Sequence, residues 1–263
     1  MSQTIVSWNV NGIRACTKKG FPDWLNNSGA CIVGLQETRA TEDKFPAGVL
    51  QPDGWHTHLS PAERPGYSGV MLYGRRPIDH ISTTLDLPDH DAEGRVQIAR
   101  YGELLLVNAY FPNGSGKNGD NSRVPFKLAF YERLRSLMNE AAQNGEKVLV
   151  MGDWNTAHRE IDIARPRENA RTSGFLPEER ETLDRWFQDG WTDTFRHFNQ
   201  DPGHYSWWSN RPGVRERNIG WRIDYILASP AAMPFVEDAN IHPEIQGSDH
   251  CPVSVQVSER IFG

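Results

Sequence analysis

Short runs of β-branched and aromatic residues recur along the whole chain, and this recurrence limits the possible folds more than any other feature. Each run is bounded by Gly, Pro, Asn or Asp, which is typical of β-strands that end in turns. Strands therefore outnumber helices in the predicted fold. The runs are TIVSWNV, ACIVGLQ, YSGVMLYG, RVQIARY, ELLLVNAYF, KVLVMGDW, HYSWWS, WRIDYILAS and PVSVQV.

Two segments have helical rather than strand periodicity. In 124–144 apolar residues recur at helical spacing, and Gly145 follows as a stop. In 177–188 a Pro-Glu-Glu start suits the helix dipole, and an apolar stripe follows it. The stretch 18–29 is a shorter third candidate. Strands with intervening helices predict a layered α/β fold.

The chain shows no internal boundary. Neither a Gly/Ser-rich linker nor a change in composition divides it, so we expect one domain over residues 1–263. Residues 6–12 (VSWNVNG) and 150–157 (VMGDWNTA) are similar, because each is an apolar strand that ends in Trp-Asn and small polar residues. Chance is one explanation of this similarity, and a two-sheet sandwich with approximate internal symmetry is the other.

Composition and charge exclude several classes of protein. Apolar residues make up 38% and charged residues 24%, which is unlike a disordered chain. No apolar run approaches the roughly 20 residues that cross a bilayer, so we expect no membrane partner. We see no secretory signal, and three scattered cysteines favour an intracellular compartment, cytoplasmic (nucleoid-associated) or nuclear. The net charge of −6 argues mildly against nucleic acid, although an acidic metal site can coexist with a basic rim.

Polar side chains stand at the ends of four strand-like runs. Asn and Asp are common in turns, so turn formation explains one or two of these cases. Glu is not a turn former, and four coincidences favour a shared site where loops converge. The residues are Asn9 and Asn11 after TIVSW, Glu37 after CIVGLQ, Asp153 and Asn155 after KVLVMG, and Asp249 and His250 before PVSVQV.

The chemistry of this set indicates a hard metal ion. Glu37, Asp153 and Asp249, with Asn9 and Asn155, are rich in oxygen, which suits Mg²⁺ or Mn²⁺ rather than zinc. A hard divalent ion beside a histidine suits phosphoryl transfer. The metal neutralises phosphate charge, a carboxylate activates water, and the imidazole binds a phosphate oxygen.

The stretch GSDHCP raises the alternative of a cysteine nucleophile paired with His250. Cys251 precedes Pro252, which biases it toward an extended conformation, and neighbours in an extended chain point to opposite faces. We therefore expect Cys251 to be a small buried residue at a strand start, and Asp249–His250 to be the working pair.

Six motifs follow one another along the chain: SWNVNGIRA, LQET, NAYFPNG, GDWNTAH, GWRIDYIL and GSDHCPV. In this order the chain resembles the exonuclease III family of abasic-site endonucleases, within the endonuclease/exonuclease/phosphatase superfamily. The motifs cover the chain from end to end, and six collinear motifs are far more specific than any one alone. The resemblance implies a four-layered α/β sandwich, with two mixed β-sheets packed face to face and helices outside.

The resemblance implies roles around the metal. Glu37 would be the principal metal ligand, with Asn9 beside it. Asp153 would orient and deprotonate the attacking water, and Asn155 would hold that water or the transition-state oxygen. The residues that it allows as metal ligands are Asn9, Glu37, Asp153, Asn155, Asp249 and His250.

The resemblance also implies contacts to the phosphate. Tyr110 would hydrogen-bond the phosphate or leaving group, and Asn113 would contact the phosphate. His250 would donate to a non-bridging oxygen, oriented by Asp224, because an acid behind a histidine fixes its tautomer and favours its protonated form. Asp224 as a structural acid and Tyr110 as a core aromatic stay open as alternatives. Some members carry Asp where this chain has Asn11, which weakens the case for a second metal position.

The segment 204–224 points to a DNA substrate, because tryptophans and arginines are interleaved there. Such a mixture suits a phosphate backbone and an extruded nucleotide. In the family, the positions of Trp207, Trp221 and Ile223 wall an apolar pocket that admits a flipped deoxyribose and has no room for a base. Trp208 is placed opposite Trp207 by alternation and is better explained as core.

Further DNA contacts are expected outside this pocket. Arg211 stands where relatives insert a side chain into the double helix. Arg14, Lys19, Tyr67 and Arg95 are additional candidates, and each could equally be ordinary surface or packing. The alternative for the whole rim is that its arginines are solvated and its tryptophans are core.

These features predict a monomeric class II abasic-site endonuclease of the exodeoxyribonuclease III type, which uses Mg²⁺ and also works with Mn²⁺. It would hydrolyse the phosphodiester 5′ to an abasic site in double-stranded DNA, remove blocked 3′ termini as a 3′-phosphodiesterase or 3′-phosphatase, and act as a 3′→5′ exonuclease. One rival is a phosphodiesterase or phosphatase of the same superfamily for RNA, phosphoinositide or sphingomyelin. The other is a non-catalytic DNA-binding scaffold, which the presence of Glu37, Asp153, Asn155 and His250 disfavours.

Overall fold

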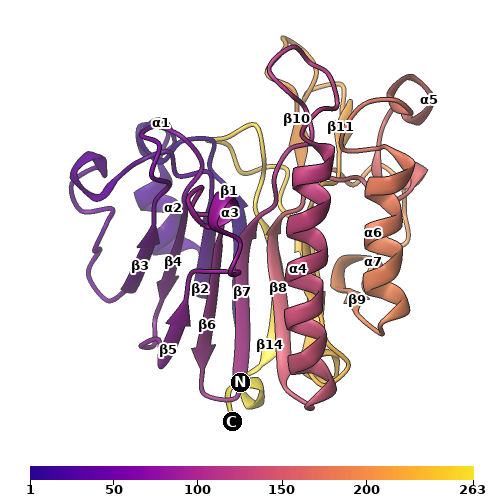
Figure 1. The fold of residues 1–263 in the computed structure, drawn as a ribbon. Coiled ribbons are helices and arrows are strands. Elements are labelled where there is room, and N and C mark those ends of the chain that lie inside the picture. The colour runs from indigo at the N-terminus through magenta and orange to yellow at the C-terminus, as the bar shows by residue number, and fades with distance from the viewer.

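Two six-stranded mixed sheets form the body of the structure, a computed structural model that describes all residues from 1 to 263 (Figure 1). The first sheet contains, in spatial order, β13 (Val236–Ile241), β14 (Val253–Ser258), β1 (Ser2–Asn9), β2 (Ala30–Gln36), β4 (Val70–Gly74) and β3 (His56–Ser60). The second contains β5 (His80–Ser82), β6 (Val96–Tyr101), β7 (Leu104–Tyr110), β8 (Lys147–Asp153), β12 (Asp224–Ala228) and β9 (Thr192–Asp193). A separate two-stranded ribbon consists of β10 (Trp207–Trp208) and β11 (Gly220–Trp221).

The two sheets share one strand arrangement. In the first, β1 runs parallel to β2 and antiparallel to β14, and in the second, β8 runs parallel to β7 and antiparallel to β12. Beyond them, β4 and β6 pair antiparallel with β2 and β7. Because β1 and β8 are the strands of the similar segments 6–12 and 150–157, internal symmetry rather than chance explains that similarity.

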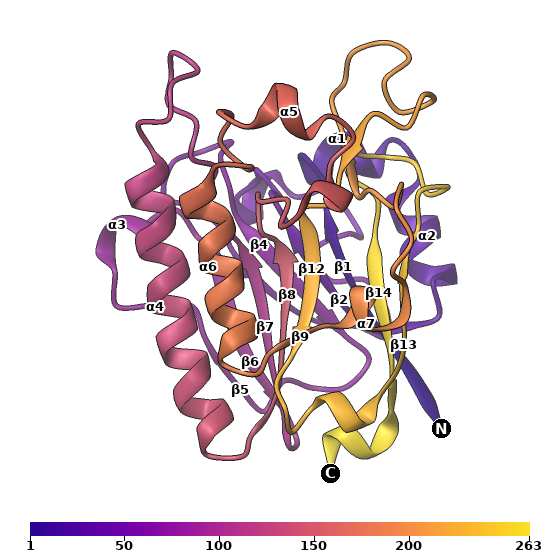
Figure 2. The ribbon, with the colours of Figure 1, turned by 90° about the vertical axis from the view of Figure 1, so that its right-hand side faces the viewer.

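Helices cover the outer faces of both sheets, which gives the four layers that the resemblance implies (Figure 2). On the second sheet, Phe130 and Leu134 of α4 and Leu183 of α6 pack with Val150 of β8. Aliphatic side chains of both sheets fill the space between them. The helices are α1 (Ile13–Thr17), α2 (Phe21–Asn27), α3 (Pro88–Asp91), α4 (Val124–Gln143), α5 (Pro166–Asn169), α6 (Pro177–Gln188) and α7 (Thr194–Phe198).

The elements expected from the sequence are present, and the additional ones are short or lie at sheet edges. α4, α6 and α2 correspond to the three expected helices. The strands that the sequence did not reveal include β3, β5 and β13, whose side chains are largely polar or charged. Edge strands commonly carry such residues, which prevent pairing with other chains and hide the apolar signal of a strand. No helix here combines the length and apolar character that crossing a bilayer needs.

A buried polar seam links the two sheets beneath the rim where β1, β2 and β8 end. Gln36 of β2 donates through Nε2 to Asn108 Oδ1 of β7 at 2.7 Å and to Ser7 Oγ of β1 at 3.0 Å. Asn108 Nδ2 donates in turn to Gln97 Oε1 at 3.0 Å, and Gln97 Nε2 to Ser60 Oγ at 3.1 Å. Since these bonds cross from one sheet to the other, they fix the relative position of the strand ends.

Candidate active site

Two matching turns form the base of the site, one after β1 and one after β8, at the end of the sandwich far from both chain termini (Figures 1 and 2). Asn11 and Asn155 have left-handed backbone conformations, with φ of 44° and 51°. Asparagine tolerates that conformation better than most residues other than glycine. In each turn the asparagine N–H donates to the side chain two residues earlier, to Asn9 Oδ1 at 2.9 Å and to Asp153 Oδ1 at 2.8 Å.

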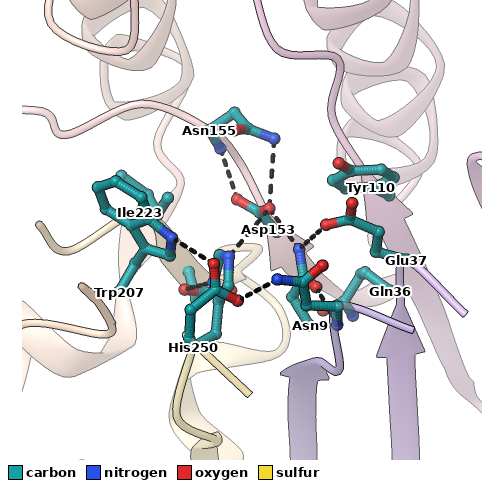
Figure 3. Close-up of polar contacts among 12 residues, drawn as sticks. Asn9, Gln36, Glu37, Tyr110, Asp153, Asn155, Trp207, Ile223 and His250 are labelled. Carbon is teal, nitrogen blue, oxygen red and sulfur yellow. Dashed lines mark hydrogen bonds and ion pairs between the residues drawn. The ribbon is translucent and has the colours of Figure 1, made fainter. Parts of the chain in front are cut away.

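Asn9 connects the two halves of the site (Figure 3). Its Nδ2 donates to Glu37 Oε2 at 3.0 Å and to Asp153 Oδ2 at 2.8 Å. Because its Oδ1 already accepts from Asn11, the buried amide presents hydrogen rather than oxygen to the two acids. In this arrangement Asn9 lies between the two acids and donates to both. To act as an oxygen ligand to a metal, as predicted, its side-chain amide would have to rotate.

Glu37 follows β2 in a left-handed conformation, with φ of 58°. Its Oε1 accepts from Arg39 Nε at 2.9 Å and from the Arg39 Nη2. The backbone N–H groups of Thr38 and Arg39 donate to Gly69 O at 3.0 Å and Ser68 O at 2.8 Å, which holds this segment in place. A cation therefore stands at Glu37 in the form of the Arg39 guanidinium. The hard oxygen donors of the site and this stand-in charge both fit a divalent metal.

His250 lies between two buried acids. Its Nδ1 is 2.9 Å from Asp224 Oδ2 and its Nε2 is 3.9 Å from Asp153 Oδ2, and Ser206 Oγ donates to Asp224 Oδ2 at 2.6 Å. Burial alone would lower the pKa of His250, but the charges of Asp224 and Asp153 outweigh it and raise that pKa to about 10. The ligand atoms of His250, Asp153 and Asp224 lie within 4.8 Å of one another. A protonated imidazole has no free lone pair, so His250 is better suited to donate to a phosphate than to bind metal.

Asp153 and Asp249, two of the three acids that line the cleft, have opposite pKa shifts. Burial raises the pKa of Asp153 to about 7, with His250 opposing the shift and Asp224 adding to it. Burial would also raise the pKa of Asp249, but the charge of His250 and hydrogen bonds from Asn11 and Trp207 lower it below its ordinary value. At neutral pH Asp249 is therefore ionised, whereas Asp153 is poised to take up a proton.

These groups open into a cleft of about 380 Å³. On one side, Trp207 and Trp221 face each other across the β10–β11 ribbon with perpendicular rings, their centroids 5.9 Å apart, and Ile223 packs beside them. Tyr110 lies across the site from Trp207 (Figure 3), and Asn113 also lines the cleft. Burial and the charge of Glu37 raise the pKa of Tyr110 well above its usual value, so its hydroxyl stays protonated. The cleft thus joins an apolar wall to a polar, charged floor.

Comparison with known proteins identifies the family. A family model described as "Endonuclease/Exonuclease/phosphatase family" matches residues 6–250. The chain belongs to this family. An exodeoxyribonuclease of Bacillus subtilis (strain 168) is 37% identical over 97% of this chain and 99% of its own. The DNA repair nuclease APEX1 of Danio rerio is 36% identical over 95% of this chain and 81% of its own. The solved structure of an AP endonuclease from Archaeoglobus fulgidus matches with a TM-score of 0.87 at 25% identity, over 97% of this chain and 99% of that one.

In this family member the cleft gathers most of the site residues expected from the sequence. Asn9 and Asp224 lie directly beneath it, bonded to Asp153 and His250. Cys251 and Trp208 are buried together on the other side of the chain from His250, as expected. The expected residues that line the cleft are Glu37, Tyr110, Asn113, Asp153, Asn155, Trp207, Trp221, Ile223, Asp249 and His250.

The DNA contacts that we expected beyond the pocket do not line the cleft, and one of them, Arg95, is wrong. These residues are Arg14, Lys19, Tyr67, Arg95 and Arg211. Arg14 is exposed in a basic hollow that adjoins the cleft, and Lys19 and Arg211 are exposed in a second hollow beside Asp249. Arg95 is only 3% exposed. Its guanidinium donates to Glu93, to Tyr110 O at 3.0 Å and to Tyr67 Oη at 2.9 Å. Because these groups already accept its N–H bonds, the Arg95 guanidinium supports the cleft from behind and is not free to contact DNA.

The residues that the sequence did not reveal include Arg39, Ser206 and Gly174. Arg39 follows the LQET motif, but nothing in the sequence indicates that its side chain turns back onto Glu37. Ser206, the residue before β10, donates to Asp224, and Gly174 lines the cleft. Gly174 has a φ of 95° and packs against Trp221, so glycine is required there. In the sequence, an isolated glycine in a polar loop does not indicate a contact with Trp221.

Proposed function

We propose that this chain is a DNA-repair nuclease that hydrolyses the phosphodiester 5′ to an abasic site in double-stranded DNA, with Mg²⁺ as its metal. One observation carries the proposal: His250, with its raised pKa, and Asp153, poised near neutrality, face an apolar tryptophan wall across a single cleft. The charged floor suits phosphoryl transfer, and the wall suits a sugar. The names of relatives, an exodeoxyribonuclease and an AP endonuclease, support the same class of substrate.

Glu37 is the residue that we expect to hold the metal, with Asp249 as the second accessible carboxylate. Mg²⁺ bound there would neutralise phosphate charge and help to ionise the attacking water. Glu37 would exchange at least one contact with Arg39 for the metal, because the guanidinium occupies one carboxylate oxygen and Asn9 the other. Asn11 donates to Asp249 Oδ1 at 2.8 Å, so an amide stands where a further acid would favour a second ion. Mn²⁺, with similar preferences, should also support activity.

The side chains of the cleft divide the chemistry among them. Asp153 accepts a proton from the attacking water, since a carboxylate with a pKa near 7 is effective at neutral pH. Asn155, whose Nδ2 is 3.2 Å from Asp153 Oδ2, orients that water. His250, held by Asp224, donates from Nε2 to a non-bridging phosphate oxygen. Tyr110 donates its hydroxyl proton to a hydrogen bond with the phosphate or the leaving oxygen.

The substrate assignment rests on the apolar wall and the rim. Trp207, Trp221 and Ile223 suit a flipped deoxyribose, and a missing base lowers the free-energy cost of extrusion. Exposed cations around the cleft suit the phosphates of a duplex. The proposal includes removal of blocked 3′ termini and 3′→5′ exonuclease activity, because each breaks a phosphate ester with the same groups. We expect an intracellular monomer. The exposed cations are Arg14, Lys19 and Arg211, and the uncharged contacts proposed beside them are Asn113 of the cleft and the half-buried Tyr67.

A labelled duplex with one abasic site tests this function. We expect Mg²⁺ to give a nick with a 3′-hydroxyl and a 5′-deoxyribose phosphate, and a chelator to abolish it. An undamaged duplex, a single-stranded RNA and an inositol phosphate serve as competing substrates. An abasic duplex left intact in Mg²⁺, or faster hydrolysis of the RNA or inositol phosphate, would overturn the assignment.

A further inference from the structure

A lysine and a glutamate are completely buried behind the cleft. Lys127 of α4 and Glu179 of α6 have 0% exposed side chains, and Lys127 Nζ lies 2.7 Å from Glu179 Oε1. A buried ion pair is weak evidence of a stabilising role, because the loss of hydration offsets much of the attraction. Neither residue lines the cleft. The role of the pair must therefore follow from the other groups to which Lys127 and Glu179 are hydrogen-bonded.

Lys127 holds the turn that follows β8. Its Nζ donates to Asn155 O at 2.7 Å. The Asn155 N–H donates to Asp153 Oδ1, and Asn155 Nδ2 donates to Phe111 O at 2.9 Å. Tyr131, one helical turn after Lys127, donates to Trp154 O. The backbone N–H, the carbonyl and the side-chain Nδ2 of Asn155 are thus all hydrogen-bonded, and Lys127 supplies the bond to the carbonyl.

Glu179 holds a loop of the cleft wall. Its Oε1 accepts from Ser173 Oγ at 2.8 Å, and its Oε2 from the N–H groups of Gly174 and of Leu176, the latter at 3.1 Å. Gly174 is packed tightly, because a Cβ there would lie 3.0 Å from Trp221 Cζ3. The Gly174 carbonyl accepts from Ala157 N at 2.8 Å, which returns the loop to the same turn.

We propose that Lys127 and Glu179 are a positioning pair, which sets the Asn155 turn and the Gly174 wall relative to each other and so places water and sugar in register. The inference rests on the proposed function for its consequence in catalysis. Neither side chain touches substrate, so the pair acts through Asn155 and Gly174. In the matching turn, no side chain donates to the Asn11 carbonyl. A buried donor to the carbonyl of the turn, such as Lys127, is therefore found only in the half of the site that carries Asp153.

Two variants separate positioning from stability. Lys127→Met leaves Glu179 as an unpaired buried charge, so it should lower both the melting temperature and kcat on abasic DNA, the latter by about 10- to 100-fold. Adding Glu179→Gln removes that charge and keeps an acceptor for the Gly174 loop. The double variant should therefore regain most of the lost melting temperature but little of the lost kcat, because Asn155 O still lacks its donor. KM should change by less than about threefold in both, since no DNA contact is altered.

Leu134→Ala is the matched control, because Leu134 is buried on the same helix, seven residues after Lys127, and carries no polar group that could bond the turn. It should lower the melting temperature as much as Lys127→Met and leave kcat within about threefold of wild type. A double variant that regains kcat together with stability, or a control that loses kcat equally, would show that the pair is merely structural.

Hydrogen exchange supplies a readout that needs no activity. In Lys127→Met, peptides that cover 154–157 and 172–176 should exchange faster than in Leu134→Ala. Equal exchange in the two variants would refute the positioning role even if wild type cleaves abasic DNA. Conversely, faster exchange with a wild type that fails to cleave would refute the proposed function and leave the positioning pair intact.

Discussion

The turns after β1 and β8 have the same backbone geometry but opposite chemistry. Asn11 and Asn155 occupy equivalent left-handed positions, and each N–H donates to the side chain two residues earlier. That earlier side chain is Asn9 in the first half and Asp153 in the second. Asn9 is neutral and donates toward the acids, whereas Asp153 accepts. Approximate symmetry therefore builds two similar arms, β1 with the turn at Asn11 and β8 with the turn at Asn155. They differ by one exchange of amide for carboxylate, and in the proposed function that exchange places the proton acceptor in the second arm.

The two arms also differ in what supports them. In the first, the ion pair at the site is Arg39–Glu37, with 44% and 14% of the side chains exposed. In the second, buried ion pairs such as Lys127–Glu179 and Arg222–Asp162 stand behind the cleft. Since a partly exposed pair exchanges partners more readily than a fully buried one, the first arm would suit the proposed exchange of Arg39 for a metal, and the second suits fixed geometry.

Asp153→Asn would give the second arm the chemistry of the first, and we expect the largest effect from it. Asn can still accept from Asn155 N–H, so the turn should persist, but the bond from Asn9 Nδ2 to Oδ2 is lost and the melting temperature should fall modestly. Cleavage of abasic DNA should fall by roughly 10³-fold, because the proton acceptor is lost. Single-turnover cleavage with thermal unfolding measures both effects. Asp53→Asn, on an exposed loop, is the control. A loss of less than about tenfold would contradict the assigned role.

Asn9→Asp makes the reverse exchange and should have an intermediate effect. A carboxylate at that position would lie near Glu37 Oε2 and Asp153 Oδ2, which now accept from Asn9 at 3.0 and 2.8 Å. Without metal, lost hydrogen bonds and repulsion should lower the free energy of unfolding by roughly 1–3 kcal/mol. Mg²⁺ should recover part of that loss, so its stabilising shift in melting temperature should exceed that of wild type. An equal shift in both proteins would argue against a metal at this end of the site.

The strand ends could be predicted because β-strand patterns and strand-terminal polar residues are local signals. Glu37, Asp153 and His250 each stand beside an apolar run, and the sheets bring those ends together. The seam between Gln36 and Asn108 could not be predicted, because its partners are 72 residues apart and neither has a local signature. Partner choice at such distances depends on the packing of the two sheets.

Charged residues were the hardest to place. Arg95 precedes a strand in the same way as many surface arginines, and only the three-dimensional structure reveals the acid and the two tyrosines around it. The burial of Lys127 is indicated by the sequence, because Tyr131, Leu134 and Met138 follow it at helical spacing on the buried face of α4. A lysine on an apolar stripe predicts a buried partner, but it does not say that the partner is Glu179.

Acid titration should reveal the smallest difference between the two halves. Burial would raise the pKa of Asp162, but the charges of Arg222 and Arg196 outweigh it and lower that pKa to about 2, from 3.8. The folded-state value is below the unfolded one, so the stabilisation is present above about pH 4 and is lost as pH falls toward 2. It amounts to about 2–3 kcal/mol, at about 1.4 kcal/mol per pKa unit.

Urea unfolding of wild type and Asp162→Asn at pH 5 and at pH 2.5 measures this loss. The variant lacks the titrating group, so its stability should fall less between the two pH values than that of wild type, by up to about 2 kcal/mol. Hydrogen exchange at low pH should also rise earlier around Arg222 than around the Asn11 turn, because the buried acid lies behind the second arm. Equal pH dependence in both proteins would mean that Asp162 keeps its charge, or its ordinary pKa, in both states. The contrast between a buried, ion-paired arm and an open one would then need another physical cause.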